Sequence, residues 1–333
     1  MSTIMTDPGT SNQSHVLAVD IGGTKIAAAM VSRRGKIMAR TTEAVDISSK
    51  SGPIRQIRRI ARELAQTPRL KEVFAAGAVA VPGLVRQSGT VWAPNLPGWE
   101  HMPLRTRLER AMEIPFAVES DRNAAVLGET WMGTAKGKKD AVVLIIGTGI
   151  GAGIIAGGQI VRGAHELSGC AGWLVVNDSY VNEARHLGQL EAFTAGPGIA
   201  RTAAKLIQNG GKGLLHEYTT QITTREVADA AREGDPEAIA IFEDAGKMMG
   251  RAVANIVSMF DPEVVIIAGG MAATSDLFMP SLTASMREWA QPLASRQVRI
   301  KVSQLKGDAN LLGTARLAWS LTPRVRKKKA TIR

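Results

Sequence analysis

Two glycine-rich segments of this chain have the residue types needed to bind the oxygens of a polyphosphate. The first reads DIGGTK at 20–25, and the second reads GTGIGAG at 147–153. Glycines let successive backbone amides approach a ligand and point toward anionic oxygens, and one threonine in each segment adds a hydroxyl donor. Tight hairpin turns also use glycine, so either segment alone could be only a turn. As a pair, they favour the binding of a polyphosphate.

Phosphoryl transfer also requires charge neutralisation by a metal ion and a group that accepts the proton of the attacking hydroxyl. Asp20 ends the first predicted strand beside its glycine segment, where it could hold Mg²⁺ directly or through water. Asp121 follows another predicted strand and opens a predicted helix, where it could orient a sugar hydroxyl and take its proton. Aspartate is also a common helix N-cap, and both roles are compatible at Asp121.

The two glycine segments occupy the same place in two similar sets of predicted strands. Apolar runs at 15–20 and 141–146 precede them, and further short runs and turns follow. Neither segment has the spacing of a Walker A loop or the strand-loop-helix context of a dinucleotide fold. The repetition indicates an internal duplication, with the phosphate site built from two hairpins.

The remaining elements are predicted from periodicity and capping signals. A capping box at Thr223 and an N-cap at Asp235 mark two helix starts. The whole segment GTGIGAG is interpreted as one continuous loop. Strands and helices alternate in both halves, which predicts an α/β protein of two lobes, each with a largely covered mixed sheet. The cleft between the lobes is the expected ligand site. The predicted elements outside the glycine segments are helices at 54–64, 104–112, 122–131, 236–260, 277–290 and 309–321, and strands at 75–81, 114–118, 263–268 and 298–302.

The expected domain boundaries follow from this order of elements. We expect a disordered leader at 1–14, a small lobe at 15–132 that is completed by the helix at 308–322, a large lobe at 133–307, and a basic tail at 323–333.

Composition limits the class of protein and its partners. A single cysteine, Cys170, excludes a disulfide framework and a cysteine-rich zinc site within the chain. No apolar run has the length needed to span a bilayer, and the first residues lack a signal-peptide pattern, so we expect a cytoplasmic protein. Of the net charge of +11, six positive charges lie at 324–333. That distribution and the low aromatic content make a nucleic-acid partner unexpected. The alternative is a weak contact of the basic tail with a phosphate backbone.

Several motifs together resemble the ROK family, in the order in which that family has them and over about 17–321. This family comprises bacterial-type glucokinases, N-acetylhexosamine kinases and related sugar-responsive repressors. The resemblance implies an actin-like, hexokinase-like ATPase fold whose two lobes close on ATP and a sugar, and homodimers are common in the family. The motifs are DIGGTK, VPG at 81–83, APNLPGW at 93–99, ESDRNAAVLGE at 119–129, GTGIGAG, GQLEAFTAGPGI at 188–199 and DPEVVIIAGG at 261–270.

The resemblance also implies a role for individual residues. Asp121 matches the catalytic base and Asp20 the acid associated with Mg²⁺. On the sugar side, Gly83, Asn95 and Glu191 match positions in or near the hexose pocket, and Glu191 is preferred because a carboxylate can accept two hydroxyl hydrogen bonds. The residues that match the ATP-binding positions are Gly22, Gly23, Thr24 and Lys25 in the first segment, Gly147, Thr148 and Gly149 in the second, and Gly269 and Gly270 near the nucleoside.

The chain departs from the family pattern on the sugar side. Ser120 stands where the family usually has asparagine before the base, which shortens or removes one sugar contact, and Arg122 replaces a small residue after it. At 169–176 the family typically reads GEIGH, whose glutamate and histidine contact the sugar; Trp173 and Val176 are interpreted as standing in those two places. Trp173 suits the apolar side of a pyranose or an N-acyl group, or alternatively packs in the core.

The family's structural zinc is not expected in this chain. In the family, the histidine of GEIGH joins three cysteines around the metal. Here EARHLGQ at 183–189 replaces the cysteine cluster, and His186 is the only nearby histidine. A lone histidine is more often a surface or core residue than a metal ligand.

The leading hypothesis is an ATP-dependent, Mg²⁺-requiring kinase that phosphorylates a hexose or amino-hexose on its 6-hydroxyl. The alternative is a sugar-binding or regulatory protein with weak or no catalysis, because the family's glutamate and histidine are missing. DNA repression is disfavoured, since about 14 residues before the first strand are too few for a helix-turn-helix. Polyphosphate in place of ATP is a third alternative, which a basic surface could attract.

Overall fold

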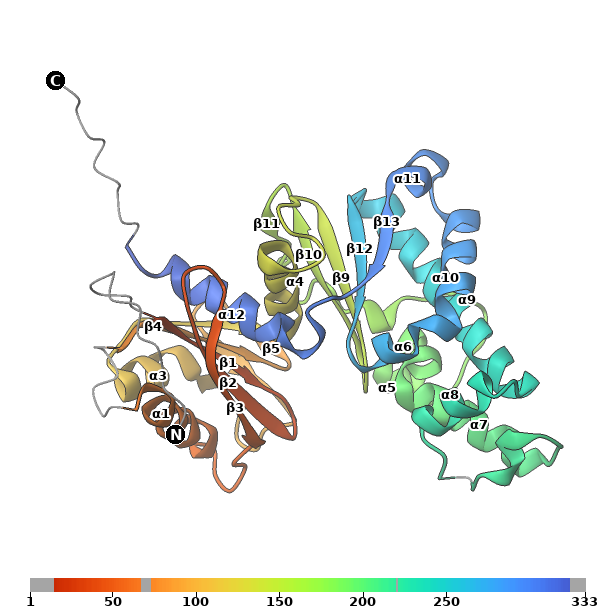
Figure 1. Ribbon diagram of the computed structural model, residues 1–333, viewed down its shortest axis with the longest axis horizontal. Coiled ribbons are helices and arrows are strands. Elements are labelled where there is room, and N and C mark those ends of the chain that lie inside the picture. Colours follow the sequence, from red (N-terminus) through yellow and green to blue (C-terminus); the bar gives the residue numbers. More distant parts are fainter. Residues whose placement is uncertain (1–14, 67–72, 220, 324–333) are drawn as a thin grey trace, which may run out of the picture. The chain divides into compact units, whose positions relative to one another are not determined.

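The computed structural model describes residues 15–66, 73–219 and 221–323. The predicted leader at 1–14 and the basic tail from 324 onward lie outside these residues. The described chain forms two compact units, shown with their elements in Figure 1. Unit 1 comprises the described residues up to Asp121 and from Asn310 onward, and unit 2 comprises Arg122–Ala309.

Unit 1 is built on a five-stranded mixed sheet in the order β3-β2-β1-β4-β8. The first three strands are antiparallel neighbours, whereas β1 pairs with β4, and β4 with β8, in parallel. The central strand β1 has four consecutive apolar residues, 16–19, that are fully buried, as expected of a strand covered on both faces. The strands are β1 (His15–Ile21), β2 (Lys25–Val31), β3 (Ile37–Ala44), β4 (Phe74–Val81) and β8 (Phe116–Ser120).

Helices and a second, smaller sheet complete unit 1. Helix α1 (Gly52–Ala65) buries Ile54, Ile57 and Ile60 on one face, as their spacing predicts. Helix α12 (Ala309–Ser320) joins the unit from the far end of the sequence, because the Trp319 Nε1 donates to the Ser32 carbonyl at 3.1 Å. The other elements are α3 (Leu104–Met112) and the small antiparallel sheet β5 (Leu84–Val85), β6 (Thr90–Trp92) and β7 (Met102–Pro103).

Unit 2 contains a second five-stranded sheet, in the order β11-β10-β9-β12-β13. Its first three strands are antiparallel neighbours and its last three are parallel, so the sheet repeats the order and the directions found in unit 1. This agreement supports the predicted internal duplication. The strands are β9 (Ala141–Ile146), β10 (Ile150–Ala156), β11 (Gln159–Ile160), β12 (Val264–Ala268) and β13 (Arg299–Val302).

A long helix, α9 (Pro236–Phe260), organises the helical part of unit 2. Its N-cap Asp235 accepts from the Glu237 and Ala238 amides, as predicted. Gly246 and Gly250 let α10 approach closely, since a Cβ at either position would lie 2.5 to 2.6 Å from a carbonyl oxygen of that helix. The remaining helices are α4 (Asp121–Met132), α5 (Ala184–Leu187), α6 (Gln189–Thr194), α7 (Gly196–Asn209), α8 (Thr224–Arg232), α10 (Ser275–Trp289) and α11 (Pro292–Gln297).

The second glycine segment is shorter as a loop than the sequence predicts. Strand β10 begins at Ile150, so only residues 147–149 form the turn. Gly151 and Gly153 lie within the strand because α4 packs against it: a Cβ on Gly153 would be 2.1 Å from the Arg122 carbonyl oxygen. These two glycines therefore allow close packing of a helix and are not part of the turn. The same packing joins α4 after Asp121 to unit 2, whereas the predicted lobe boundary lies at residue 132.

Both units are thus α/β structures with a mixed sheet and flanking helices, which confirms the predicted class. Among the described residues, no helix is both long and apolar enough to cross a membrane.

Candidate active site

A cavity of about 750 Å³ in unit 2 lies beside the turn that follows β9. This volume is within the range of small-molecule sites. Gly147 and Thr148 of the turn line it, together with Gly270 after β12 and the first turns of α7 and α8. The positive dipole ends of two helices favour an anionic ligand in such a place. We call this cavity the donor cavity.

The backbone around the donor cavity depends on glycine. The Gly147 amide donates to the Gly149 carbonyl at 2.9 Å, which closes the turn, and the Gly147 carbonyl accepts from Gly196 at 2.9 Å, which joins the turn to α7. Gly269 has a φ of +86°, and a Cβ there would lie 2.4 Å from the Ile146 carbonyl oxygen. A Cβ on Gly147 would be 3.7 Å from the Gly270 amide nitrogen. The structure therefore brings the predicted residues 147–149 and 269–270 together.

The residues that α7 and α8 contribute to this cavity were not predicted. Thr224 Oγ1 donates to the Gly196 carbonyl at 2.7 Å and so joins the starts of the two helices. Arg232 is held by Asp276, with Nη2 2.9 Å and Nε 3.0 Å from the carboxylate oxygens, whereas Arg225 is exposed at the cavity. The capping box at Thr223 located the start of α8 in the sequence. It carried no information on which turn that helix would meet.

Glu191 lies next to the same turn: Thr148 lines the donor cavity, and the following residue, Gly149, is close to the Glu191 carboxylate. Its Oε2 accepts from the Ile150 amide at 2.6 Å, and a Cβ on either Gly149 or Gly172 would be 2.9 Å from that oxygen. The side chain is partly buried, and this burial raises the pKa of Glu191, against which the Ile150 hydrogen bond acts. The structure thus places the predicted sugar-binding carboxylate beside the phosphate turn.

Trp173 is exposed beside Glu191. It ends a 3-10 turn at Ala171–Trp173, and 56 % of its surface is accessible, so the alternative in which it packs in the core is wrong. Val176, in contrast, is buried in the core of unit 2, and its amide donates to Gln189 Oε1 at 2.7 Å.

The glycines of this segment also correct the comparison with GEIGH. The motif has two glycines three residues apart, and here Gly169 and Gly172 have that spacing. Neither has room for a side chain, since a Cβ on Gly169 would lie 1.8 Å from the Ala152 carbonyl oxygen. In this register Cys170 and Trp173, instead of Trp173 and Val176, stand in the places of the glutamate and the histidine. The Cys170 Sγ accepts from Arg122 Nη1 at 3.1 Å.

In unit 1, Asp20 lies near the end of β1 with its carboxylate largely buried. Asn310 Nδ2 is 3.2 Å from both carboxylate oxygens. Burial raises the pKa of Asp20 to about 6; the Asn310 hydrogen bond opposes this rise, and the negative charge of Asp121 adds to it. Asp20 and Asp121 are therefore close enough to repel each other. Two carboxylates in repulsion, one of them buried, suit a hard cation with oxygen ligands such as Mg²⁺.

The other predicted site residues of unit 1 lie in the segments that follow Asp20 and precede Asp121, and at Asn95. Asp121 begins α4 directly after β8, and Ser120 before it is buried. The Gly22 amide donates to the Lys25 carbonyl at 2.7 Å, which leaves Gly23, Thr24 and Lys25 exposed in the turn. A Cβ on Gly23 would lie 3.9 Å from the Asn95 Cβ, so these two segments are neighbours.

Gly83 has a structural requirement of its own. Its φ is +101°, and a Cβ would lie 2.3 Å from the Trp92 carbonyl oxygen. Gly83 therefore allows β5 and β6 to approach, and a role toward a sugar stays a prediction.

Within the described ranges, no group of three or more His, Cys, Asp or Glu side chains is placed to hold a metal ion. Cys170 and His186 lie in the segment where the family zinc site would be, and the expected lack of zinc stays a prediction from the sequence.

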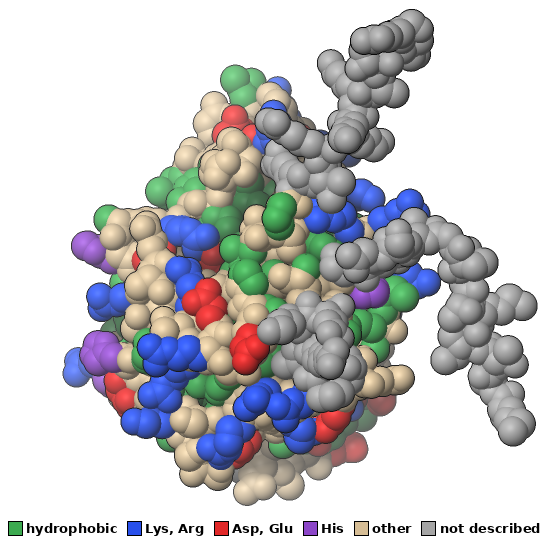
Figure 2. All heavy atoms as spheres, turned by 90° about the vertical axis from the view of Figure 1, so that its left-hand side faces the viewer, with side chains coloured by type: hydrophobic (Ala, Val, Ile, Leu, Met, Phe, Trp, Pro, Cys, Tyr) green, Lys and Arg blue, Asp and Glu red, His purple; other side chains and the backbone are tan. Residues whose placement is uncertain are grey.

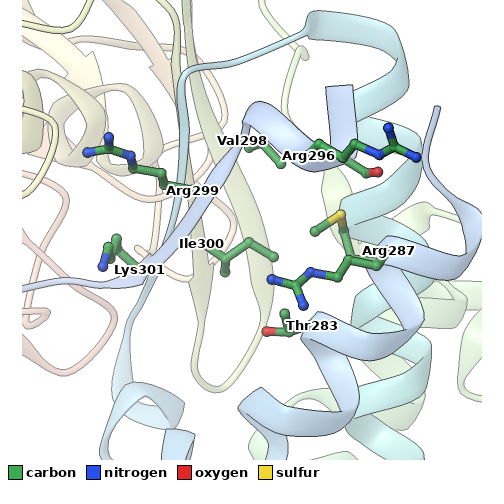
Figure 3. Close-up of a pocket in the computed structure, with 9 residues that line it drawn as sticks. Thr283, Arg287, Arg296, Val298, Arg299, Ile300 and Lys301 are labelled. Carbon is green, nitrogen blue, oxygen red and sulfur yellow. The ribbon is translucent and has the colours of Figure 1, made fainter. Parts of the chain in front are cut away.

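A second cavity of about 580 Å³ lies between α10, α11 and β13 (Figure 3). Its lining is basic, but the charged groups do not converge. Arg287 points toward Thr283 and Ile300, whereas Arg299 and Lys301 extend from the opposite side of β13 (Figure 3). On the face shown in Figure 2, basic side chains are likewise interspersed with acidic and hydrophobic ones. Neither view shows a continuous basic surface suited to a nucleic acid.

Comparison with known proteins places this geometry in a family. A model of the ROK family matches residues 16–320. A glucokinase of Thermotoga maritima is 30 % identical over 306 residues, which cover 90 % of this chain and 96 % of that protein. A xylose repressor of Caldicellulosiruptor bescii is 33 % identical over 263 residues, 77 % of this chain and 65 % of that protein. Among solved structures, a ROK family glucokinase from Streptomyces griseus in complex with glucose and AMPPNP is 29 % identical with a TM-score of 0.72, covering 92 % of this chain and 100 % of that one.

Proposed function

The chain belongs to the ROK family, and from this membership and the geometry of the site we propose that it is an ATP-dependent sugar kinase. Its fold is the actin-like, hexokinase-like fold of the solved ROK kinases. The proposed reaction transfers the γ-phosphoryl group to a hydroxyl of a hexose or amino-hexose. Relatives named glucokinase and a related structure that contains glucose and AMPPNP support both the donor and the class of acceptor.

The donor cavity is the observation that carries this proposal. Its wall combines the glycine turn at 147–149, the glycines after β12 and the starts of two helices. A nucleotide fits a cavity of this volume and polarity, with its phosphates on the turn amides and the Thr148 hydroxyl. In unit 1, the turn at 22–25 is proposed to bind phosphate through its own backbone amides.

The catalytic roles follow from the chemistry of phosphoryl transfer. Asp121 would hold the acceptor hydroxyl and take its proton once the bond to phosphorus is forming, since the hydroxyl becomes acidic only then. Asp20 would hold Mg²⁺, which when bound neutralises the charge on the phosphates. Glu191 would orient the sugar by accepting hydrogen bonds from its ring hydroxyls.

We propose the 6-hydroxyl as the acceptor. It is attached through an exocyclic carbon that rotates freely, so it can turn toward a general base while the ring hydroxyls stay bonded to the protein. Ser120, Asn95 and Gly83 are proposed to complete the sugar contacts in unit 1.

The second candidate function is a regulatory sugar binder. The similarity to a xylose repressor favours it, because proteins named as regulators are related to this chain as well as proteins named as kinases. Incubation with Mg-ATP and a panel of hexoses, amino sugars and disaccharides, followed by ³¹P NMR, separates the two candidates. A sugar phosphate signal is the expected result. Sugar-dependent thermal stabilisation with no transfer to any acceptor would favour the binder.

A further inference from the structure

Exposed hydrophobic side chains are concentrated in one short segment of unit 2. Of the twelve large hydrophobic residues that are exposed in the described part of the chain, five lie within residues 167–187. Contiguous exposed apolar surface marks sites for ligands or partners, which makes this segment a candidate for one. The five are Leu167, Trp173, Val175, Tyr180 and Leu187.

Trp173 is the largest of these side chains, and its backbone is fixed. Gly172 before it contacts Glu191, and a Cβ on Gly188 would lie 2.6 Å from the Trp173 Cα. The Trp173 amide donates to the Cys170 carbonyl at 3.1 Å, and the Leu190 amide donates to the Leu174 carbonyl at 3.3 Å. An indole that is open to solvent on a fixed backbone loses only its two side-chain torsions when a ligand stacks on it.

Trp173 and the donor cavity both belong to unit 2, and the turn at 147–149 connects their surroundings. Thr148 lines that cavity, Gly149 follows, and the next amide, Ile150, is bonded to Glu191. Trp173 and Glu191 therefore lie where the phosphate turn passes into β10. A hydroxyl that attacks the terminal phosphate must come within about 3 to 3.5 Å of it, so an acceptor for a nucleotide bound at this turn has to bind close to the turn.

Glu191 and Trp173 suit different parts of an acceptor molecule. Glu191 accepts hydrogen bonds from hydroxyls, whereas Trp173, together with the exposed Leu187 on the contacting helix α5, offers an apolar surface. On the basis of the proposed kinase function, we propose that the acceptor is a hexose that carries an apolar substituent, which packs on Trp173 while ring hydroxyls bind Glu191. Trp173 is then the residue that determines specificity.

Kinetics with three sugars test this assignment. Glucose has no apolar substituent, N-acetylglucosamine carries one on C2, and phenyl β-glucoside carries one on C1. We expect kcat/KM for one of the substituted sugars to exceed that for glucose by about tenfold or more, which is the usual range for an apolar group that finds its pocket. Trp173→Ala should remove that preference, mainly through KM, so that the substituted sugar loses more of its kcat/KM than glucose does.

Two further variants separate a role in specificity from a structural role. Trp173→Phe keeps an aromatic face and should restore most of the preference. Trp289→Ala is the matched control, because Trp289 is exposed to 59 % in the same unit at the end of α10 and should leave the preference unchanged. Equal rates with all three sugars in the wild type, or an equal loss for all sugars in Trp173→Ala, would overturn the assignment.

Calorimetric binding of the same sugars distinguishes failure of this inference from failure of the proposed function. A protein that transfers no phosphate but binds a substituted sugar tighter than glucose, with the difference lost in Trp173→Ala, would refute the kinase and keep the role of Trp173 in ligand choice. Transfer to glucose with no binding preference for either substituted sugar would keep the kinase and refute the inference.

Discussion

At the scale of single residues, Asp20 shows a conflict between stability and function. Burial raises its pKa from the ordinary 3.8 to about 6, so the charged carboxylate destabilises the folded protein above pH 6. Between pH 4 and 6 the folded state holds a proton that the unfolded state has lost, and stability therefore falls as pH rises through this window. A group that destabilises the metal-free protein while suiting a cation is typical of a binding site.

Replacement of Asp20 by asparagine removes the buried charge. In the absence of Mg²⁺, Asp20→Asn should be more stable than the wild type at pH 8, by on the order of 1 to 3 kcal/mol, and the difference should vanish near pH 4. Denaturant unfolding at several pH values measures it. A stability difference that does not vary with pH would contradict the account of Asp20. The same variant should lose Mg²⁺-dependent phosphoryl transfer.

Glu191 allows a prediction that separates the acceptor from the donor. In Glu191→Gln the amide oxygen can still accept from the Ile150 amide, so the turn should be preserved. The loss of a charged acceptor should raise KM for the sugar by about 10- to 100-fold, equivalent to about 1.4 to 2.8 kcal/mol, with KM for ATP within about twofold of the wild type. Steady-state kinetics in both substrates gives the two values. An equal rise in both KM values would show that Glu191 acts on the turn and not on the sugar.

At the scale of elements, the contact between α4 and β10 explains why the second glycine segment was misjudged. Gly151 and Gly153 were predicted as loop residues, because the sequence alone does not distinguish a glycine that permits a turn from one that lets a neighbouring helix approach. Helices α3 and α9 were predicted with their observed bounds, and for α9 the N-cap Asp235 and the proline after it mark the start locally. The arrangement of α7 and α8 around the donor cavity has no local signal, because it depends on contacts between distant segments.

Gly153 supplies a stability test of this packing. A Cβ at this position would lie 2.1 Å from the Arg122 carbonyl oxygen, which belongs to backbone and cannot move aside cheaply. Gly153→Ala should therefore destabilise unit 2 by about 1 to 3 kcal/mol. Gly307→Ala is the control, since a Cβ there meets nothing within 4 Å. Thermal unfolding measures both variants, and equal melting temperatures would contradict the close approach of α4 to β10.

At the scale of the whole molecule, the sequence predicted the family and the fold because both rest on many motifs in a fixed order. The family match and the two sheets of equal topology confirm these predictions. The sugar-binding side of the site was harder to predict from the sequence. The exposure of Trp173 depends on how residues 167–190 pack near Glu191, and no residue pattern in that segment indicates this packing. The cleft between lobes as the ligand site remains a prediction.

The proposed reaction draws on both units. Asp20 and Asp121 belong to unit 1, whereas the donor cavity and Glu191 belong to unit 2. A kinase built in this way should bind nucleotide through unit 2 when the base in unit 1 is disabled. Binding and transfer are therefore separable by a single substitution.

That substitution is Asp121→Asn, which keeps the size of the side chain and an oxygen that can cap α4 but removes the base. The decisive measurement is phosphoryl transfer to the best acceptor, made together with calorimetric binding of AMPPNP, for this variant and the wild type. The account predicts a loss of kcat of at least about 100-fold, as expected for removal of a general base, with the Kd of AMPPNP within about threefold. Turnover retained near the wild-type rate would remove Asp121 from its assigned role and contradict the proposed mechanism.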